Sequence, residues 1–224
     1  MQKQDDKIII FDWGGVVESH ENDCQDLKEA KIRMIKRYNN SLSDQEILDR
    51  WTDMTLTGVS MGSTNKEEDI KDWVNLVQKN MDIDITFEEF KKAYEEELTS
   101  VKYYKDVVEF AHSLKDKCKI AILSNLMLFD KKRIDDQYDL SKFDYVYLSF
   151  ELEMRKPNKK IYEYVLQDLN IKPENILFID DDYNNIVSAR ECGWNTCQAF
   201  GYELDRIKDD VHKFLEEKNE NIRI

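Results

Sequence analysis

The arrangement of five short apolar runs along the chain limits the fold more than any other feature of the sequence. Each run is rich in Ile, Val, Leu or Phe and lacks regular alternation with polar residues, which is typical of parallel strands buried on both faces of a sheet. The runs are Lys7–Asp12, Lys119–Ser124, Tyr145–Leu148, Ile176–Asp180 and a weaker one at Asn195–Ala199. Helix-like stretches follow the last four runs, near Phe129–Gln137, Asn158–Leu169, Asp182–Cys192 and Glu203–Lys218. This alternation predicts an α/β fold with a doubly wound parallel sheet and right-handed crossovers.

The segment between the first two runs, from about Ser19 to Ser100, breaks this rhythm because it has no convincing strand pattern. Two capping boxes, Ser43 with Glu46 and Thr86 with Glu89, mark helix starts within it. The four helices that we expect there are Cys24–Tyr38, Ser43–Met54, Lys66–Lys79 and Thr86–Leu98. The sequence therefore predicts a helical domain, residues 19–100, inserted into an α/β domain made of residues 1–18 and 101–224.

The charge balance excludes several classes of partner. The chain has 33 Lys and Arg against 47 Asp and Glu, a net charge of −14, which disfavours nucleic acid and anionic membranes. The sequence contains no secretion signal and no apolar stretch long enough to span a membrane. Its four cysteines, Cys24, Cys118, Cys192 and Cys197, form no CxxC pair, which favours reduced thiols. We therefore expect a cytoplasmic protein.

Polar residues follow the predicted strands at the point where each one ends. In an open parallel sheet, ligands bind beyond the carboxyl ends of the strands, so these residues are expected to converge. Any one of them alone could be an ordinary helix cap, turn or surface residue, but their joint placement favours a site. They are Asp12 with Trp13, Gly14 and Gly15, then Ser124 with Asn125, then Arg155, Lys156 and Pro157, and finally Asp180, Asp181 and Asp182.

The segments IIIFDWGGVV, AILSN, MRKPNKKIY and LFIDDDYNNIVSA resemble, in the same order, the motifs of the haloacid dehalogenase-like (HAD) hydrolase superfamily. The subgroup with a helical cap domain after the first motif fits best. Within it, the chain is similar to sugar-phosphate phosphatases of the α-glucose-1-phosphate type and to the phosphatase domain of epoxide hydrolases. The resemblance implies a Rossmann-like core and Mg²⁺-dependent hydrolysis of a small phosphorylated metabolite, such as a sugar phosphate.

The resemblance also implies a role for each site residue. Asp12 is expected to be the nucleophile that forms an aspartyl-phosphate, with Ser124 and Lys156 as the other catalytic residues. The expected metal ligands are Asp12, Asp181 and the Gly14 carbonyl, with Asp180 as a further ligand or as an acceptor for a metal-bound water. The expected substrate-binding residues, several through their main-chain N–H groups, are Trp13, Gly14, Gly15, Ser124, Asn125 and Lys156.

The charges at this site make a cation necessary. A phosphate dianion with Asp12, Asp180 and Asp181 carries −5, and each like-charge pair at about 4 Å costs roughly 4 kcal/mol at an effective dielectric constant near 20. Lys156 and Mg²⁺ together supply +3 and reduce the total to −2. Mg²⁺ suits this environment because it binds carboxylates, phosphate and water.

Gly14 departs from the family pattern, since most of its phosphatases have a second Asp there as general acid and base. General acid catalysis contributes about 10²–10⁴ in rate, so turnover is expected to be slow or limited to good leaving groups. Glu18 or His20 could replace the missing group, or they could be ordinary hinge residues.

Trp51 and Met61 are candidates for the cap side of the pocket. The alternative functions are a weakly active or non-catalytic phosphate-binding regulatory protein and, less favoured, a 2-haloacid dehalogenase. We expect the protein to be a monomer or a dimer.

Overall fold

The computed structural model describes residues 7–19, 25–56, 67–97, 103–126, 131, 134–135 and 138–216. Five parallel strands form one sheet in the order β3-β2-β1-β4-β5. The strands are β1 (Ile8–Phe11), β2 (Lys119–Ser124), β3 (Tyr145–Leu148), β4 (Ile176–Asp180) and β5 (Asn195–Gln198). All five predicted strands and the parallel α/β architecture are therefore confirmed, and β1 lies at the centre of the sheet.

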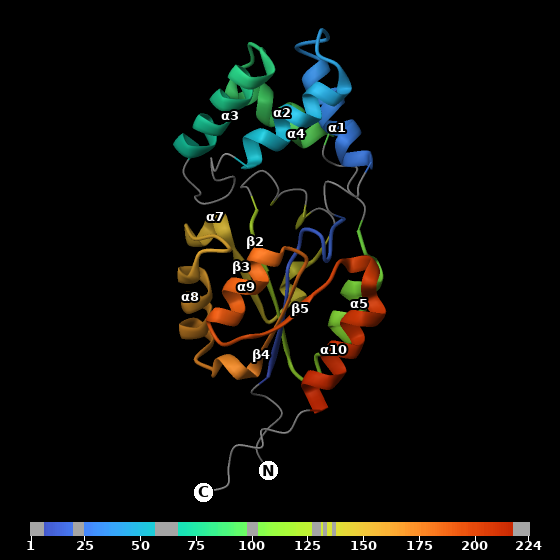
Figure 1. Cartoon of the computed structure of the whole chain (residues 1–224), viewed down its shortest axis with the longest axis vertical. Coiled ribbons are helices and arrows are strands. Elements are labelled where there is room, and N and C mark those ends of the chain that lie inside the picture. Colours follow the sequence, from blue (N-terminus) through green and yellow to red (C-terminus); the bar gives the residue numbers. More distant parts are fainter. Residues whose placement is uncertain are drawn as a thin grey trace, which may run out of the picture.

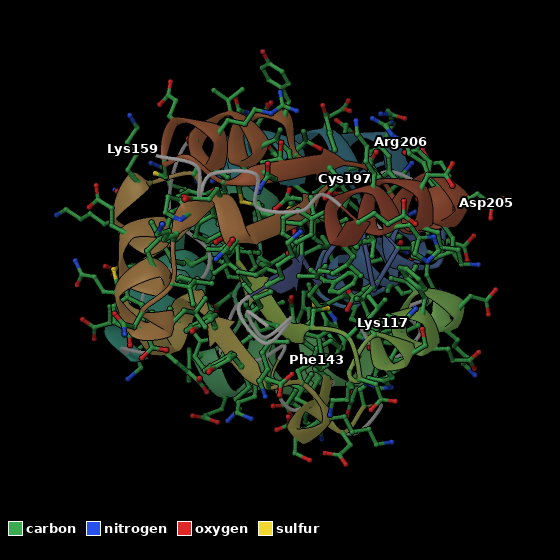
Figure 2. The ribbon with its side chains drawn as sticks, turned by 90° about the horizontal axis from the view of Figure 1, so that it is seen from below. Lys117, Phe143, Lys159, Cys197, Asp205 and Arg206 are labelled. Atoms are coloured by element: carbon green, nitrogen blue, oxygen red, sulfur yellow. The ribbon has the colours of Figure 1, made fainter. Side chains whose placement is uncertain are left out.

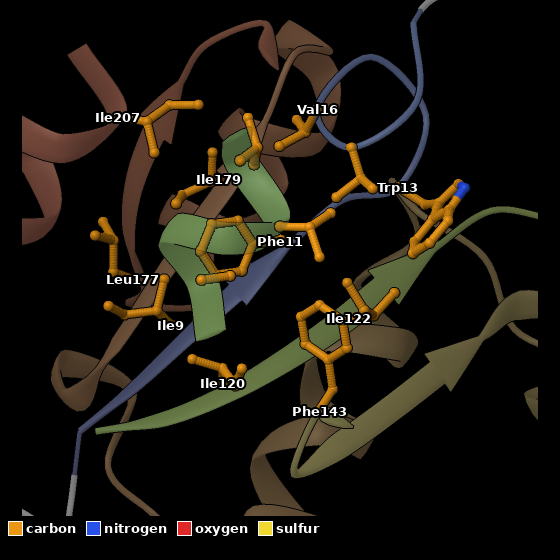
Figure 3. Packing of buried hydrophobic residues seen from close by; sticks show 14 of the residues in the cluster. Ile9, Phe11, Trp13, Val16, Ile120, Ile122, Phe143, Leu177, Ile179 and Ile207 are labelled. Carbon is orange, nitrogen blue, oxygen red and sulfur yellow. The ribbon is translucent and has the colours of Figure 1, made fainter. Parts of the chain in front are cut away.

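Helices cover both faces of the sheet (Figure 1). Ile9 and Phe11 of β1 belong to an apolar cluster that α5 (Lys105–Ser113) and α10 (Leu204–Glu216) complete. Ile8 and Ile10 belong to a second cluster, completed by α8 (Lys159–Leu169) and α9 (Tyr183–Glu191). Successive side chains of a strand point to opposite faces, so an uninterrupted apolar run supplies both clusters. Figure 3 shows the first cluster from close by. The helices around the sheet are α5 (Lys105–Ser113), α7 (Ser149–Leu152), α8 (Lys159–Leu169), α9 (Tyr183–Glu191) and α10 (Leu204–Glu216), with short 3₁₀ helices η2 (Leu140–Lys142), η3 (Pro173–Asn175) and η4 (Gly201–Glu203).

The outer faces of these helices carry the charged residues. Figure 2, which views the molecule from below, shows Lys159 and Asp205 at the periphery and Cys197 inside. Cys118, Cys192 and Cys197 form no disulfide among the described residues, and Cys24 lies outside them. Among the described residues, no helix has the length and apolar character needed to cross a membrane.

Four helices between β1 and β2 pack around an apolar core of their own. They are α1 (Gln25–Lys36), α2 (Asp44–Leu56), α3 (Glu67–Met81) and α4 (Phe87–Glu97), close to the predicted ranges. Trp51, Trp73 and Phe90 make edge contacts within this core, and Arg33 of α1 pairs with the nearly buried Glu97 of α4. The four helices gather beyond the end of the sheet at which β1 ends (Figure 1).

Both capping boxes form as predicted. The main-chain N–H of Ser43 donates to Glu46 Oε2 (2.8 Å), and the N–H of Glu46 donates to Ser43 Oγ (3.3 Å). Thr86 and Glu89 repeat the pattern at 2.9 and 3.3 Å. Each box satisfies two N–H groups that the first helical turn leaves unpaired, which explains why these short motifs locate helix starts so well.

The sequence reasoning missed α5 and α7, and most of the predicted helix Phe129–Gln137 lies outside the described residues. Helix α5 follows Tyr104, whose side chain makes no capping hydrogen bond, so the usual start signal is absent. It is held by tertiary packing instead, because Val107, Val108 and Ala111 are buried against the sheet.

Candidate active site

The register of the sheet brings the ends of β1 and β4 together. Phe11 pairs with Ile179, so Asp12 and Asp180, one residue further along each strand, are neighbours. The N–H of Asp12 continues the ladder by donating to the carbonyl of Ile179 (2.8 Å). Ser124 ends β2 on the other side of β1. The carboxyl ends of three adjacent strands thus carry Asp12, Ser124 and Asp180 to one edge of the sheet.

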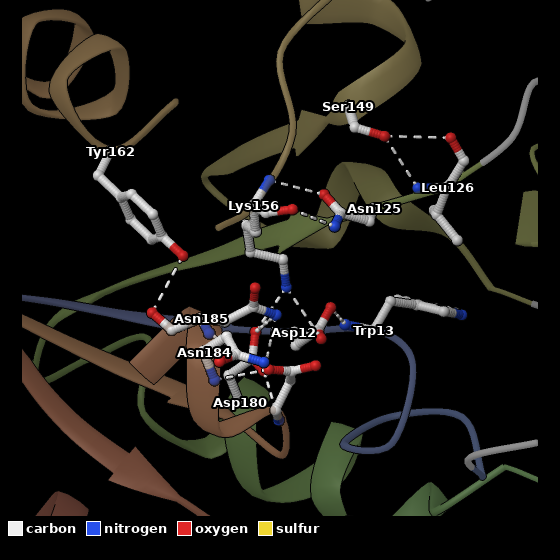
Figure 4. A network of polar contacts seen from close by, with 11 residues as sticks. Asp12, Trp13, Asn125, Leu126, Ser149, Lys156, Tyr162, Asp180, Asn184 and Asn185 are labelled. Atoms are coloured by element: carbon white, nitrogen blue, oxygen red, sulfur yellow. Dashed lines mark hydrogen bonds and ion pairs between the residues drawn. The ribbon is translucent and has the colours of Figure 1, made fainter. Parts of the chain in front are cut away.

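Lys156 reaches this edge from the loop between α7 and α8 and binds two of the carboxylates (Figure 4). Its Nζ lies 2.9 Å from Asp12 Oδ2 and 2.6 Å from Asp180 Oδ2. The lysine is 1% exposed, and Asp180 is fully buried. A buried ammonium of this kind is tolerable only because charged acceptors surround it.

Asp180 is held by further donors on its other side. The Nδ2 of Asn185 lies 3.1 Å from each of its carboxylate oxygens, and the main-chain N–H of Asp182 donates to its Oδ1 (2.8 Å). Asp182 itself caps α9 by accepting from the N–H groups of Asn184 and Asn185. The sequence reasoning did not single out Asn185. The available signal was its position on the buried face of the helix, shared with Ile186.

Burial and charge oppose each other in this cluster. Burial raises the pKa of Asp12 and of Asp180, and the nearby Lys156 ammonium lowers both. Asp181 raises the pKa of Asp12 further by its like charge. Although burial favours a neutral lysine, the two carboxylates raise the pKa of Lys156. Lys156 therefore keeps its positive charge, but one ammonium does not balance the carboxylates of Asp12, Asp180 and Asp181.

The residues present fit a divalent metal ion. Asp12, Asp180 and Asp181 each offer a carboxylate oxygen, and these three atoms lie within 4.8 Å of one another. Three carboxylates and one ammonium leave two negative charges if all are ionised, which matches a divalent cation. Hard oxygen donors of this kind are the ligands that Mg²⁺ prefers. Asp12 and Asp180 are the buried members, and Asp181 is partly exposed.

Two glycines allow close approaches of the chain around the loop that follows β1. Gly15 has φ +77°, and a Cβ there would lie 2.3 Å from Asp181 Cγ. Gly201 donates its N–H to the carbonyl of Gly15 (2.8 Å), and a Cβ on Gly201 would lie 2.2 Å from the carbonyl oxygen of Val16. The loop after β5 therefore supports the loop after β1. The sequence reasoning missed Gly201 because this contact joins segments far apart in the chain.

Ser124 and Asn125 serve different purposes. The Ser124 hydroxyl is fully buried and makes no hydrogen bond of good geometry within the described part of the chain, although it lies close enough to Asp12 to lower the pKa of that carboxyl. Buried hydroxyls are rarely left unpaired, so this one fits a donor to a bound ligand oxygen. The Asn125 amide instead donates to the carbonyl of Lys156 (2.8 Å) and accepts from its N–H (2.9 Å). Its side chain therefore places Lys156.

Trp13, Gly14 and Glu18 form the start of the chain segment that leaves β1 for the helical insert. The N–H of Trp13 donates to Asp12 Oδ1 (2.6 Å), so this donor is engaged by the predicted nucleophile. The Trp13 indole is 1% exposed and donates to Glu18 Oε2 (2.9 Å). A Cβ on Gly14 would meet nothing within 4 Å. Glu18 is thus tied to Trp13, and the other candidate substitute, His20, lies outside the described residues.

Of the two residues predicted for the cap side of the pocket, only Trp51 belongs to the described part of the chain. Trp51 is buried in the core of the helical insert, in edge contact with Trp73 and with the Lys31 ammonium 4.9 Å above its ring. Met61 lies outside the described residues. Trp51 is therefore placed as a packing residue of the insert.

Comparison with known proteins agrees with this geometry. A family model of haloacid dehalogenase-like hydrolases matches residues 7–193. The D-ribitol-5-phosphate phosphatase of Bacteroides thetaiotaomicron is 26% identical over 211 residues, which cover 86% of this chain and 91% of that enzyme. Two shorter matches cover only 13% and 10% of the relatives: a drimenol cyclase of Aspergillus calidoustus (38% identical, 34% of this chain) and bifunctional epoxide hydrolase 2 of Rattus norvegicus (39% identical, 24% of this chain).

Solved structures share the fold. A HAD family enzyme from Bacteroides thetaiotaomicron, in complex with magnesium and inorganic phosphate, superposes with a TM-score of 0.63 at 22% identity. The match covers 85% of this chain and 92% of that one, so it extends over the helical insert as well as the sheet. The family model covers more than half of the chain, so the chain belongs to the haloacid dehalogenase-like hydrolases, and the convergence of Asp12, Lys156 and Asp180 at the end of the sheet agrees with this.

Proposed function

We propose that the protein hydrolyses a small phosphomonoester, a sugar phosphate or sugar alcohol phosphate, with Mg²⁺ and through an aspartyl-phosphate on Asp12. The observation that carries the proposal is the state of the Asp12 carboxylate. One oxygen accepts from the Trp13 N–H at 2.6 Å, and the other lies 2.9 Å from Lys156 Nζ. A carboxylate held at both oxygens is oriented for in-line attack rather than free to rotate.

In the first step a carboxylate oxygen of Asp12 attacks phosphorus, and the bond from phosphorus to the leaving oxygen breaks. The Ser124 hydroxyl donates to a phosphoryl oxygen, and Lys156 balances negative charge on Asp12 and on the phosphoryl group. In the second step water attacks the aspartyl-phosphate, which releases inorganic phosphate and restores the Asp12 carboxylate. Because Gly14 carries no proton donor, the leaving oxygen takes its proton from water, and the proton released by the attacking water in the second step neutralises the hydroxide that this leaves.

The carboxylates of Asp12, Asp180 and Asp181 would hold Mg²⁺, which supplies positive charge for the phosphoryl oxygens when it is bound. Asn185 and Lys156 orient Asp180 for this purpose. Residues 19–100 are proposed as a cap domain that covers the site and sets substrate preference. The ribitol-phosphate-hydrolysing relative supports a polyol or sugar phosphate as the class of substrate.

Gly14 favours a second candidate, a phosphate-binding protein with little or no turnover, because the position that carries the acid and base in most relatives holds no side chain. Phosphate release from a panel of sugar, polyol, nucleotide and aryl phosphates separates the two. The assay is run with Mg²⁺, with a chelator, and with Asp12→Asn as the control. Turnover that needs both Mg²⁺ and Asp12 is expected. If the folded protein binds Mg²⁺ but releases phosphate from no substrate, the result would support the phosphate-binding function instead.

A further inference from the structure

Glu18 is one of the few buried acidic residues, at 7% exposure, and it lies outside the carboxylate cluster of the site. Its Oε2 accepts a 2.9 Å hydrogen bond from the indole Nε1 of Trp13, which is itself 1% exposed. A hydrogen bond to an ionised acceptor is stronger than one between neutral groups, and burial strengthens it further. The Trp13 ring is therefore anchored at its only polar atom.

The main chain of Trp13 is held as firmly as its ring. Its carbonyl accepts from the N–H groups of Val17 and Glu18, both at 2.8 Å. Its N–H donates to Asp12 Oδ1 at 2.6 Å. In Figure 3 the indole nitrogen lies on the side of the ring away from Phe11 and Ile122. One residue thus joins the nucleophile, through its N–H, to Glu18, through its side chain.

Aromatic contacts fix the remaining freedom of the ring. Tyr138 and Tyr103 make edge contacts with Trp13 at centroid distances of 5.5 and 6.2 Å, and they contact each other at 4.9 Å. Tyr103 also forms an isolated antiparallel β-bridge with Glu18. The two residues lie on the two chain segments that connect the sheet to the helical insert. The indole is therefore buried against two tyrosine rings and hydrogen-bonded at its nitrogen.

We propose that Glu18 is a positioning residue for the nucleophile: by holding the Trp13 indole, it fixes the direction of the Trp13 N–H that orients the Asp12 carboxylate. The rotations φ, χ1 and χ2 lie between the peptide plane and the indole. Burial, the two tyrosines and the hydrogen bonds to the Trp13 carbonyl leave few rotamers open, so a ring held by Glu18 restricts the direction of the N–H. This inference rests on the proposed function, in which Asp12 attacks phosphorus. It assigns Glu18 no proton transfer.

The test compares Glu18→Leu, Glu18→Gln and Trp13→Phe. Glu18→Leu and Trp13→Phe each remove the indole hydrogen bond, and we expect kcat to fall about 10- to 100-fold with a much smaller change in KM, because misplacement of a reacting group by about 1 Å costs on the order of 10² in rate. The variant that combines Glu18→Leu with Trp13→Phe is expected to be no slower than the slower single variant, since both substitutions remove the same hydrogen bond. Glu18→Gln keeps an acceptor, so it is expected to recover most of the lost turnover with the wild-type pH profile.

Trp194→Phe is the matched control for the Trp13 substitution. Trp194 is 3% exposed, and its indole N–H has no partner among the described residues, so its loss removes ring volume but no hydrogen bond. Its kcat should stay at the wild-type value. Turnover of Glu18→Gln as low as that of Glu18→Leu would instead make Glu18 an acid or base. Wild-type turnover in Trp13→Phe would show that the hydrogen bond between the indole and Glu18 does not affect the orientation of Asp12.

Amide NMR provides a readout that does not depend on turnover. In Glu18→Leu the main-chain N–H signal of Trp13 is expected to shift away from its wild-type position, and in Glu18→Gln it is expected to return toward it. An unchanged N–H signal in Glu18→Leu overturns the inference even if phosphatase activity is present. If the wild-type protein has no turnover, the proposed function fails, and the NMR comparison still decides the role of Glu18.

Discussion

The side chain of Asn125 and the main chain of Lys156 exchange two hydrogen bonds across 31 residues of sequence. The amide donates to the Lys156 carbonyl at 2.8 Å and accepts from the Lys156 N–H at 2.9 Å. The pair fixes the backbone from which the ammonium reaches Asp12 and Asp180. Lys156 therefore depends on the end of β2 for its placement, although it lies in a loop that follows β3.

Asn125→Asp tests this relationship with almost no change in shape. The carboxylate still accepts from the Lys156 N–H, but it no longer donates, and it faces the Lys156 carbonyl with a negative charge. An unpaired buried polar group costs about 1–3 kcal/mol, so we expect a lower free energy of unfolding and a kcat reduced about tenfold or more. Urea unfolding and steady-state kinetics measure both. Wild-type stability together with wild-type kcat would contradict the placement role.

Asn185→Leu removes the amide that donates to both oxygens of Asp180 while keeping a similar volume. Loss of such a supporting contact typically weakens metal binding about 10- to 100-fold. We expect a rise of this size in the Mg²⁺ concentration that gives half-maximal turnover, and the same rise in the Kd from calorimetry. Asn184→Leu is the matched control, since Asn184 is exposed and supplies only its main-chain N–H to Asp182. Equal Mg²⁺ affinities in the two variants would exclude a role for Asn185.

Gly15→Ala and Gly14→Ala form a second matched pair. Alanine at position 15 would adopt φ +77° and place Cβ 2.3 Å from Asp181 Cγ, whereas position 14 has no atom within 4 Å. The left-handed backbone alone costs about 1–2 kcal/mol, which corresponds to a fall in Tm of roughly 2–8 °C for a chain of this size. We expect at least this fall, and weaker Mg²⁺ binding, only in Gly15→Ala. A similar Tm for both variants would show that Asp181 moves aside freely.

Gly14→Asp tests whether the absent acid limits turnover. A Cβ at position 14 would meet nothing within 4 Å, and the motif resemblance implies that a carboxyl there would act as the proton donor. General acid catalysis matters most for poor leaving groups, so kcat for an alkyl phosphate should rise about tenfold or more relative to kcat for an aryl phosphate. Initial rates on matched alkyl and aryl esters give the ratio. A ratio equal to that of the wild type would mean that leaving-group protonation is not limiting.

The buried cysteines should resist alkylation in the native protein. Burial raises the pKa of the Cys118 thiol to about 11 and that of Cys197 to about 12, so both stay protonated at pH 8. The thiolate is the reactive form. Mass spectrometry after iodoacetamide treatment at pH 8 should find these two residues unlabelled in the native protein and labelled in urea. Native labelling at either residue would contradict their burial.

The strands and the main site residues could be predicted because their signals are local. The apolar run of β1 serves both faces of a buried sheet, and Asp12 stands at its end whatever the rest of the chain does. Ser43 and Thr86 locate helix starts because a capping box needs only four residues. Helix α5 has no such local signal, since Tyr104 offers no capping side chain and the helix depends on burial against the sheet.

Other features required the three-dimensional structure because they join residues distant in the chain. The resemblance of short motifs indicated that Asp12, Lys156 and Asp180 belong to one site, but not that one ammonium lies between the two carboxylates. Asn185 and Gly201 act through contacts that exist only once α9 and the loop after β5 have packed.

By itself, the sequence determined which residues end the strands, which segments form the four helices of the insert, and which carboxylates are available for a metal ion. These properties follow from hydrophobic periodicity and short-range hydrogen bonding, which act over a few residues. Only the tertiary structure decided that Glu18 holds Trp13 and that Asn125 places Lys156. The directions of these side chains depend on the packing of the elements around them, and that packing is a property of the whole folded chain.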